Sequence, residues 1–179
     1  MARIKSILLA VLAAAILAGA AQGASDDDGL LLDVAKKPVA AFDFHASLVT
    51  GEKVRLSAFR GKVVFLNFWA TWCVPCVLEM PSMQRLADKL KGKPFRILAV
   101  NMMEKKKQVQ RFLKNKVKVS FPIVMDPSGD IAANYSATSL PLTYIIDKKG
   151  IIVRRAIGAR EWDSPQSVQL MLRLMGEPG

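Results

Sequence analysis

The sequence predicts an α/β fold in which a mixed sheet packs against helices on its faces. Two observations support this prediction. Apolar runs of strand length alternate along the chain with segments in which apolar residues recur at helical spacing. Near the C-terminus, two strands are separated only by the turn Asp147-Lys148-Lys149-Gly150, which fits an antiparallel hairpin. Because alternating strands and helices favour parallel neighbours, the sheet should combine both strand orientations.

The elements can be placed in order along the chain. Two strands at 42–48 and 53–56, joined by a turn at 49–52, predict an N-terminal hairpin, and residues 57–61 form a helical turn or loop. Later strands are expected at 63–69, 95–101, 142–147 and 151–157, with an extended segment at 121–126. Helices are expected at 74–91, 105–116, 130–135 and about 163–175, the last with Asp163 or Ser164 as its cap and Pro165 in its first turn.

The N-terminus has the layout of a secretory signal. A short basic start, with Arg3 and Lys5, precedes fifteen apolar or small residues from Ile7 to Ala21. Small side chains at Ala21 and Gly23 predict cleavage after Gly23, with a rival site at 18–20. The run is shorter than the roughly eighteen residues of a spanning helix, although an uncleaved membrane anchor stays open. We therefore expect a signal peptide at 1–23, a linker at 24–37, one domain at 38–175, and export to the periplasm or cell envelope.

The chain is basic, with 26 Lys and Arg against 15 Asp and Glu, a formal charge of +11. The excess is concentrated at 104–107 and 111–118, where interleaved apolar residues predict an amphipathic helix with a solvated basic face. Docking of an acidic partner or of anionic lipid on that face stays open. Nucleic acid is not an expected partner of an exported protein.

Both cysteines of the chain lie in one pentapeptide, Trp72-Cys73-Val74-Pro75-Cys76, between an apolar strand and a helix. A C-x-x-C pair in this position is typical of thioredoxin-like redox sites. The N-terminus of the helix favours a thiolate on Cys73. A disulfide closing so short a loop would contribute little stability, so the pair is expected to do chemistry.

A metal site is not expected. Structural zinc needs about four ligands, and the chain has no third cysteine and a single histidine, His45. Alternation along its strand places His45 on the polar face, as a surface residue. A cysteine–histidine hydrolase would need His45 beside Cys73, and nothing in the sequence brings them together. No cofactor is implied.

These residues resemble the TlpA/ResA-like thiol-disulfide oxidoreductases, within the wider thioredoxin and AhpC/TSA-redoxin group. The resemblance rests on Gly61–Pro81 (GKVVFLNFWATWCVPCVLEMP) and Leu140–Asp147 (LPLTYIID), and it extends over roughly 38–175. It implies a thioredoxin-like fold with an N-terminal β-hairpin.

The resemblance also implies roles for the site residues. Cys73 would be the exposed nucleophile and Cys76 the resolving thiol. Pro75 would fix the geometry of the ring. Trp72 would cover the sulfur pair, with core packing as the other interpretation. Pro141 matches the family's cis-proline and would expose the backbone of Leu140 for pairing with a substrate; an ordinary trans proline in a loop is the alternative.

One position departs from the wider thioredoxin pattern. Many thioredoxins carry a buried aspartate where this chain has Asn67, and an amide cannot take a proton from Cys76. Glu79, one helical turn after Cys76, matches an acidic position of the TlpA/ResA-like group and is the candidate for that role. The alternative is a solvated glutamate on the helix surface.

Together these observations predict an exported reductant of protein disulfides, re-reduced by a membrane electron-transfer partner. Cytochrome c maturation is the role that the resemblance implies. A disulfide-forming oxidase is the alternative, because direction depends on reduction potential. A thiol peroxidase of the redoxin group is disfavoured, since Leu66 and Ala70 occupy positions where its motif needs other residues.

Overall fold

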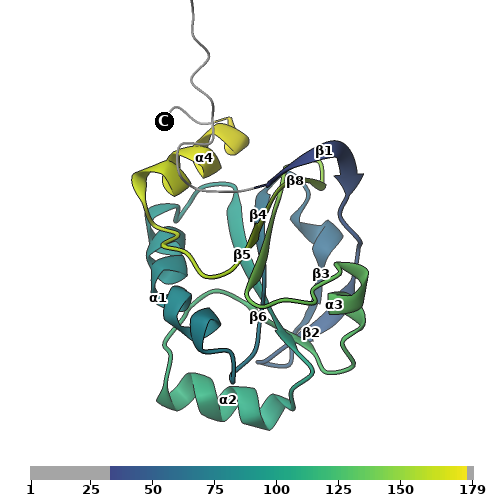
Figure 1. Ribbon diagram of the computed structural model, residues 1–179, viewed down its shortest axis with the longest axis vertical. Coiled ribbons are helices and arrows are strands. Elements are labelled where there is room, and N and C mark those ends of the chain that lie inside the picture. The colour runs from purple at the N-terminus through teal and green to yellow at the C-terminus, as the bar shows by residue number, and fades with distance from the viewer. Residues whose placement is uncertain (1–32, 177–179) are drawn as a thin grey trace, which may run out of the picture.

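The computed structural model describes residues 33–176 (Figure 1). The predicted signal segment at 1–23 and the first part of the predicted linker, up to residue 32, lie outside the described residues. The strands are β1 (Asp33–Ala40), β2 (His45–Leu48), β3 (Lys53–Arg55), β4 (Val63–Trp69), β5 (Phe95–Met102), β6 (Ile123–Asp126), β7 (Leu142–Ile146) and β8 (Ile151–Ile157). The helices are η1 (Leu56–Phe59, a 3₁₀ turn), α1 (Val74–Lys89), α2 (Lys106–Asn115), α3 (Asp130–Asn134) and α4 (Pro165–Met175).

All eight strands form one mixed sheet in the order β1-β8-β7-β4-β5-β6-β2-β3. The three central strands β4, β5 and β6 are parallel, and the strands on either side pair antiparallel. The predicted mixed sheet is therefore confirmed. The two strands predicted at 42–48 and 53–56 correspond to β2 and β3, which pair with each other, and β2 also pairs with β6.

The two faces of the sheet carry separate cores because side chains alternate along each strand. Helices α1, α2 and α4 contribute to the core that contains Phe65 and Trp69 of β4. Helix α3 and the segment before β4 cover the other face, which contains Leu66 and Phe68. Figure 1 shows this arrangement, with α1 and α4 on one side of the sheet and α3 on the other. Strand β4 is buried along its whole length, as its continuous apolar run indicates.

Strand β1 was not predicted, and part of it lies in the segment that was predicted to be a linker (24–37). It pairs antiparallel with β8, with Asp33 opposite Arg155 and Ala40 opposite Ile151. Residues 33–37 therefore belong to the edge of the sheet and not to a linker. The segment has two lysines and a proline and lacks the alternation that marks a strand, which suits an edge position.

The register places one end of the sheet at the redox motif. Phe68 near the end of β4 lies opposite Leu142 at the start of β7. The motif that follows β4 and the segment that precedes β7 thus meet at the same edge. Among the residues that the structure describes, no helix combines the length and apolar character needed to cross a lipid bilayer.

Candidate active site

Cys73 and Cys76 lie between the end of β4 and the first turn of α1. They are joined by a disulfide with an S–S distance of 2.05 Å. Cys73 is the N-cap of the helix, and its Sγ accepts a hydrogen bond of 3.3 Å from the backbone N–H of Cys76. Pro75 occupies the first turn, where it has no N–H to leave unpaired. The start of α1 therefore holds one sulfur at the positive end of a helix.

The two cysteines differ in access. Cys73 is 6% exposed and Cys76 is fully buried, so only Cys73 can be reached from outside. The expectation of an exposed Cys73 is correct only in this relative sense. Trp72 is 69% exposed, which shows that the interpretation of Trp72 as a core residue is wrong. The core tryptophans are Trp69 and Trp162.

Two further prolines belong to the segments that carry the resemblance. Pro81 lies inside α1, and the helix continues past it to Lys89. The Leu140–Pro141 peptide bond is cis, so the trans alternative is wrong. Pro141 precedes β7 and therefore lies at the same edge of the sheet as the cysteine motif, and Leu140 is half-buried against both cores.

Glu79 is the most unusual group of the site, because its carboxyl is buried beneath the motif. The residue is 2% exposed, so the alternative of a solvated surface glutamate is wrong. Three donors reach its two oxygens. Nδ2 of Asn67 donates to Oε1 at 2.8 Å, while Nε1 of Trp162 (2.8 Å) and the backbone N–H of Arg160 (3.2 Å) donate to Oε2.

Burial sets the protonation behaviour of this carboxyl. Removal from water raises the pKa of Glu79 to about 7, because the charged form loses its hydration. The bonds from Trp162, Asn67 and Arg160 favour the charged form and offset part of the rise. A carboxyl that titrates near neutral pH is suited to exchanging protons with a nearby thiol. Cys76 and Glu79 are three residues apart on α1 and share its buried face.

Asn67 links Glu79 to the sheet. Its Nδ2 donates both to Glu79 and to Oγ1 of Thr143 on β7, the latter at 3.0 Å. Asn67 and Thr143 are direct neighbours across the β4–β7 ladder, which explains the contact. The amide thus ties the carboxyl to the strand that follows Pro141.

Sequence reasoning missed two members of the site. Trp162 is buried after β8, and its ring packs edge-on against Phe65 with centroids 4.7 Å apart. Glu104 is also buried and receives bonds from the backbone N–H and hydroxyl of Thr71, from Asn101 and from Gln108. The position of Trp162 between two acidic residues was the only indication in the sequence of a special role for this tryptophan. Glu104 adjoins a lysine run and reads as the exposed start of a helix.

The described residues contain no group of three or more His, Cys, Asp and Glu side chains that could hold a metal ion. His45 lies exposed on β2, which pairs with β6 and not with the strand that carries the cysteines. Beside the two sulfurs, the site contains the buried carboxyls of Glu79 and Glu104.

The chain is similar to known proteins. The AhpC/TSA family matches residues 39–155 of the chain. The thiol-disulfide oxidoreductase ResA of Bacillus cereus is 37% identical over 154 residues, which are 85% of this chain and 88% of that protein.

Two solved structures extend the comparison. A Chlorobium tepidum protein named as a thiol:disulfide interchange protein DsbE is 34% identical, has a TM-score of 0.72, and matches over 81% of this chain and 99% of its own. StoA from Bacillus subtilis is 26% identical, with a TM-score of 0.63, over 74% of this chain and 99% of StoA. The chain therefore belongs to the AhpC/TSA family and, within it, to the ResA-like thiol-disulfide oxidoreductases.

Proposed function

We propose that this oxidoreductase reduces disulfides of proteins outside the cytoplasm. The observation that carries the proposal is the buried Glu79 beside the Cys73–Cys76 pair. A neighbouring anion disfavours a thiolate. Strong oxidants depend on a stabilised thiolate in their reduced form, so a site that disfavours the thiolate favours reduction of the client.

The reaction conserves two electrons and needs no further group. The thiolate of Cys73 attacks one sulfur of the client disulfide, and the other client sulfur leaves as a thiolate that takes up a proton. The Cys76 thiolate then attacks Sγ of Cys73, and the second client thiolate leaves. The client ends as a dithiol, and the protein ends with the Cys73–Cys76 disulfide.

The other residues of the site support these steps. Glu79 accepts the proton of Cys76 as that thiol becomes the attacking thiolate, a transfer favoured by a pKa near 7. The backbone of Leu140, ahead of the cis-proline Pro141, pairs with an extended client segment opposite Cys73. The exposed Trp72 covers the sulfur pair during this encounter.

Export and re-reduction complete the proposal. The basic start and apolar run of residues 1–21 support export, and the chain's two cysteines are both committed to redox chemistry. A membrane electron-transfer partner returns the pair to the dithiol in an oxidising compartment. Haem-binding cysteines of a cytochrome c, which must be reduced before maturation, are the proposed client.

A disulfide-forming oxidase is the second candidate, because the helix N-terminus at Cys73 favours the thiolate. Equilibration of the Cys73–Cys76 pair with glutathione buffers separates the two. We expect a potential near that of thioredoxin, about −270 mV, with turnover of insulin disulfides; a value near about −120 mV would assign the protein to the oxidases.

A further inference from the structure

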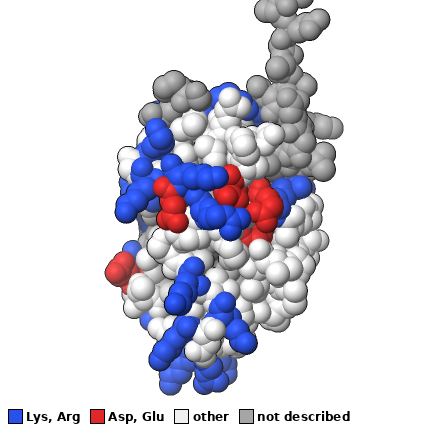
Figure 2. All heavy atoms as spheres, turned by 90° about the vertical axis from the view of Figure 1, so that its left-hand side faces the viewer, with Lys and Arg blue, Asp and Glu red and all other residues white. Residues whose placement is uncertain are grey.

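The basic segment on and after α2 takes no part in the chemistry above. Residues 105–118 contain seven basic side chains and no acidic one: Lys105, Lys106, Lys107, Arg111, Lys114, Lys116 and Lys118. All seven are exposed. Figure 2 shows basic side chains gathered at the lower end of the molecule, where α2 lies. The segment therefore presents a basic surface without an acidic side chain of its own.

This charge is not neutralised by the fold. None of the seven forms an ion pair with another described residue. Within residues 33–176, ion pairs are instead formed by Arg55, Arg85 and Lys89, among others. Glu104, the acid that directly precedes these residues in the sequence, is buried, and its oxygens accept hydrogen bonds from Thr71, Asn101 and Gln108. An unscreened positive surface raises the rate of encounter with acidic partners.

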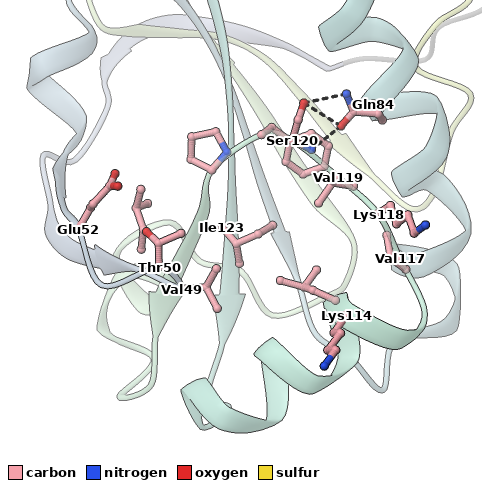
Figure 3. A pocket seen from close by; sticks show the side chains of 14 residues that line it. Val49, Thr50, Glu52, Gln84, Lys114, Val117, Lys118, Val119, Ser120 and Ile123 are labelled. Carbon is pink, nitrogen blue, oxygen red and sulfur yellow. Dashed lines mark hydrogen bonds between the residues drawn. The ribbon is translucent and has the colours of Figure 1, made fainter.

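A hollow of about 740 Å³ adjoins this helix (Figure 3). Its apolar lining includes Val49, Leu113, Val117, Val119 and Ile123. Lys114 lies on α2 at one edge of the hollow and Lys118 on the segment that follows α2, whereas Glu52 lies on the opposite side. Such a site can bind an apolar side chain of a client protein while acidic residues next to it in the client face the basic side chains of α2.

The surface is tied to the redox site. Gln108, in the first turn of α2, donates to Oγ1 of Thr71 at 3.3 Å, and Thr71 is two residues before Cys73. Trp72 and Val74, the two chain neighbours of Cys73, are exposed apolar side chains. A protein that brings a disulfide to Cys73 therefore meets the start of α2 as well.

We propose that α2, with the hollow beside it, selects client proteins whose disulfide is flanked by acidic and apolar residues. This proposal rests on the reductase function proposed above and names its substrate class. A protein segment is favoured over a membrane because a concave hollow admits a side chain, whereas a bilayer contacts a flat or convex face.

Three disulfide peptides that differ only in their flanking residues test the proposal. One carries aspartates, one serines and one lysines beside the same cysteines and one leucine. We measure the second-order rate constant for their reduction by the dithiol protein. The aspartate peptide is expected to react about tenfold faster than the serine peptide, and the lysine peptide slower. Raising salt from about 20 mM to about 500 mM should remove most of this preference.

Two matched double variants locate the effect. Lys107→Glu/Arg111→Glu reverses two charges four residues apart on α2 and should abolish the preference for the aspartate peptide. Lys91→Glu/Lys149→Glu makes the same change in charge at the opposite end of the sheet. This variant should keep the preference for the aspartate peptide. The serine peptide should react equally with wild type and both variants, which shows that the redox site is intact.

Each other outcome has a definite meaning. Equal rates for the three peptides, or equal losses in both variants, would overturn the docking proposal and leave the reductase function standing. Equal rates together with binding to phosphatidylglycerol vesicles would assign the surface to a membrane. No reduction of any peptide would overturn the proposed function, and the docking proposal with it.

Discussion

Three donors converge on the carboxyl of Glu79, and one of them, the amide of Asn67, also carries an oxygen that can accept. A carboxylate accepts all three, from Asn67, Trp162 and Arg160. When Glu79 binds a proton, one oxygen becomes a donor and needs an acceptor. The Oδ1 of Asn67 is buried without a partner among the described residues. Rotation of that amide would offer Oδ1 both to the Glu79 hydroxyl and to Thr143, so either protonation state can be hydrogen-bonded.

The difference in access between the two sulfurs gives the first prediction at this scale. Cys73→Ser should abolish reduction of insulin disulfides, because it removes the sulfur that a client can reach. Cys76→Ser should trap a mixed disulfide with the client, detectable by non-reducing electrophoresis. Substantial turnover by the Cys73 variant would reverse the two roles.

The second prediction concerns Glu79→Gln. If the carboxyl takes a proton from Cys76, the variant should resolve the mixed disulfide about 10²-fold more slowly or worse, while the first attack by Cys73 stays nearly unchanged. The wild-type rate of resolution should also show an inflection near pH 7, which the variant lacks. Stopped-flow reduction of a disulfide probe across pH measures both steps.

Glu161→Gln is the matched control, since Glu161 lies beside Trp162 and its side chain is exposed to solvent. A Glu79→Gln variant that matches wild type in rate and pH profile would show that no proton passes through this carboxyl.

At the scale of elements, the sequence pattern predicted the helices and strands whose bounds depend on neighbouring residues. The strand β4 and helix α1 lie close to their predicted bounds, because a continuous apolar run and the cysteine motif mark both. The cap of α4 was left open between two residues, and the structure selects Ser164, whose Oγ accepts from the backbone N–H of Ser167 at 3.2 Å. Asp163 instead pairs with Arg85.

Contacts between distant segments could not be predicted in this way. Trp162 meets Glu79 across 83 residues of sequence, and Thr71 meets Glu104 across 33. Periodicity carries no information about such pairs. The pattern alone therefore left Glu79 open between a proton acceptor and a surface residue, and it gave no sign that the fold buries Glu104.

The turn before Cys73 gives the prediction at this scale. Glu104→Gln places an amide NH₂ where two donors now reach a carboxylate oxygen, so it should lower the free energy of unfolding by about 1–3 kcal/mol. Loss of a negative charge near Cys73 should also favour its thiolate and raise the potential of the pair by on the order of 10 mV. Urea unfolding and glutathione equilibration measure the two effects.

Thr71→Val provides the control for Glu104→Gln. It removes the hydroxyl bond and keeps the backbone bond to Glu104, so it should cost about 1 kcal/mol and leave the potential unchanged. If wild type, Glu104→Gln and Thr71→Val have equal reduction potentials, Glu104 stabilises the fold and does not influence the cysteine pair.

At the scale of the whole molecule, we predict that the N-terminal segment directs export and is then removed. The apolar run from Ile7 to Ala21 and the small residues before position 24 predict that the exported chain begins near Ala24. N-terminal sequencing of the protein from fractionated cells should find it with the soluble envelope proteins. Recovery of the intact N-terminus in the membrane fraction would instead identify the segment as an anchor.

The buried carboxyl also makes the stability of the entire fold depend on pH. The pKa of Glu79 rises from 4.5 to about 7 in the folded chain, so between these values the folded state binds a proton that the unfolded state has released. The contribution of Glu79 to stability should therefore be fully present below about pH 4.5 and be lost as pH rises through about 7. A shift of this size corresponds to about 3 kcal/mol.

Other groups titrate over the same range, so the difference between proteins carries the test. The free energy of unfolding of wild type, minus that of Glu79→Gln, should decrease by about 3 kcal/mol between about pH 4 and pH 8 and stay level outside that range. Urea unfolding of the oxidised proteins at each pH supplies the values. Glu52→Gln, at an exposed position in the turn between β2 and β3, should run parallel to wild type over the whole range. If the difference between wild type and Glu79→Gln does not change with pH, the Glu79 carboxyl titrates alike in the folded and unfolded chain, and burial does not raise its pKa.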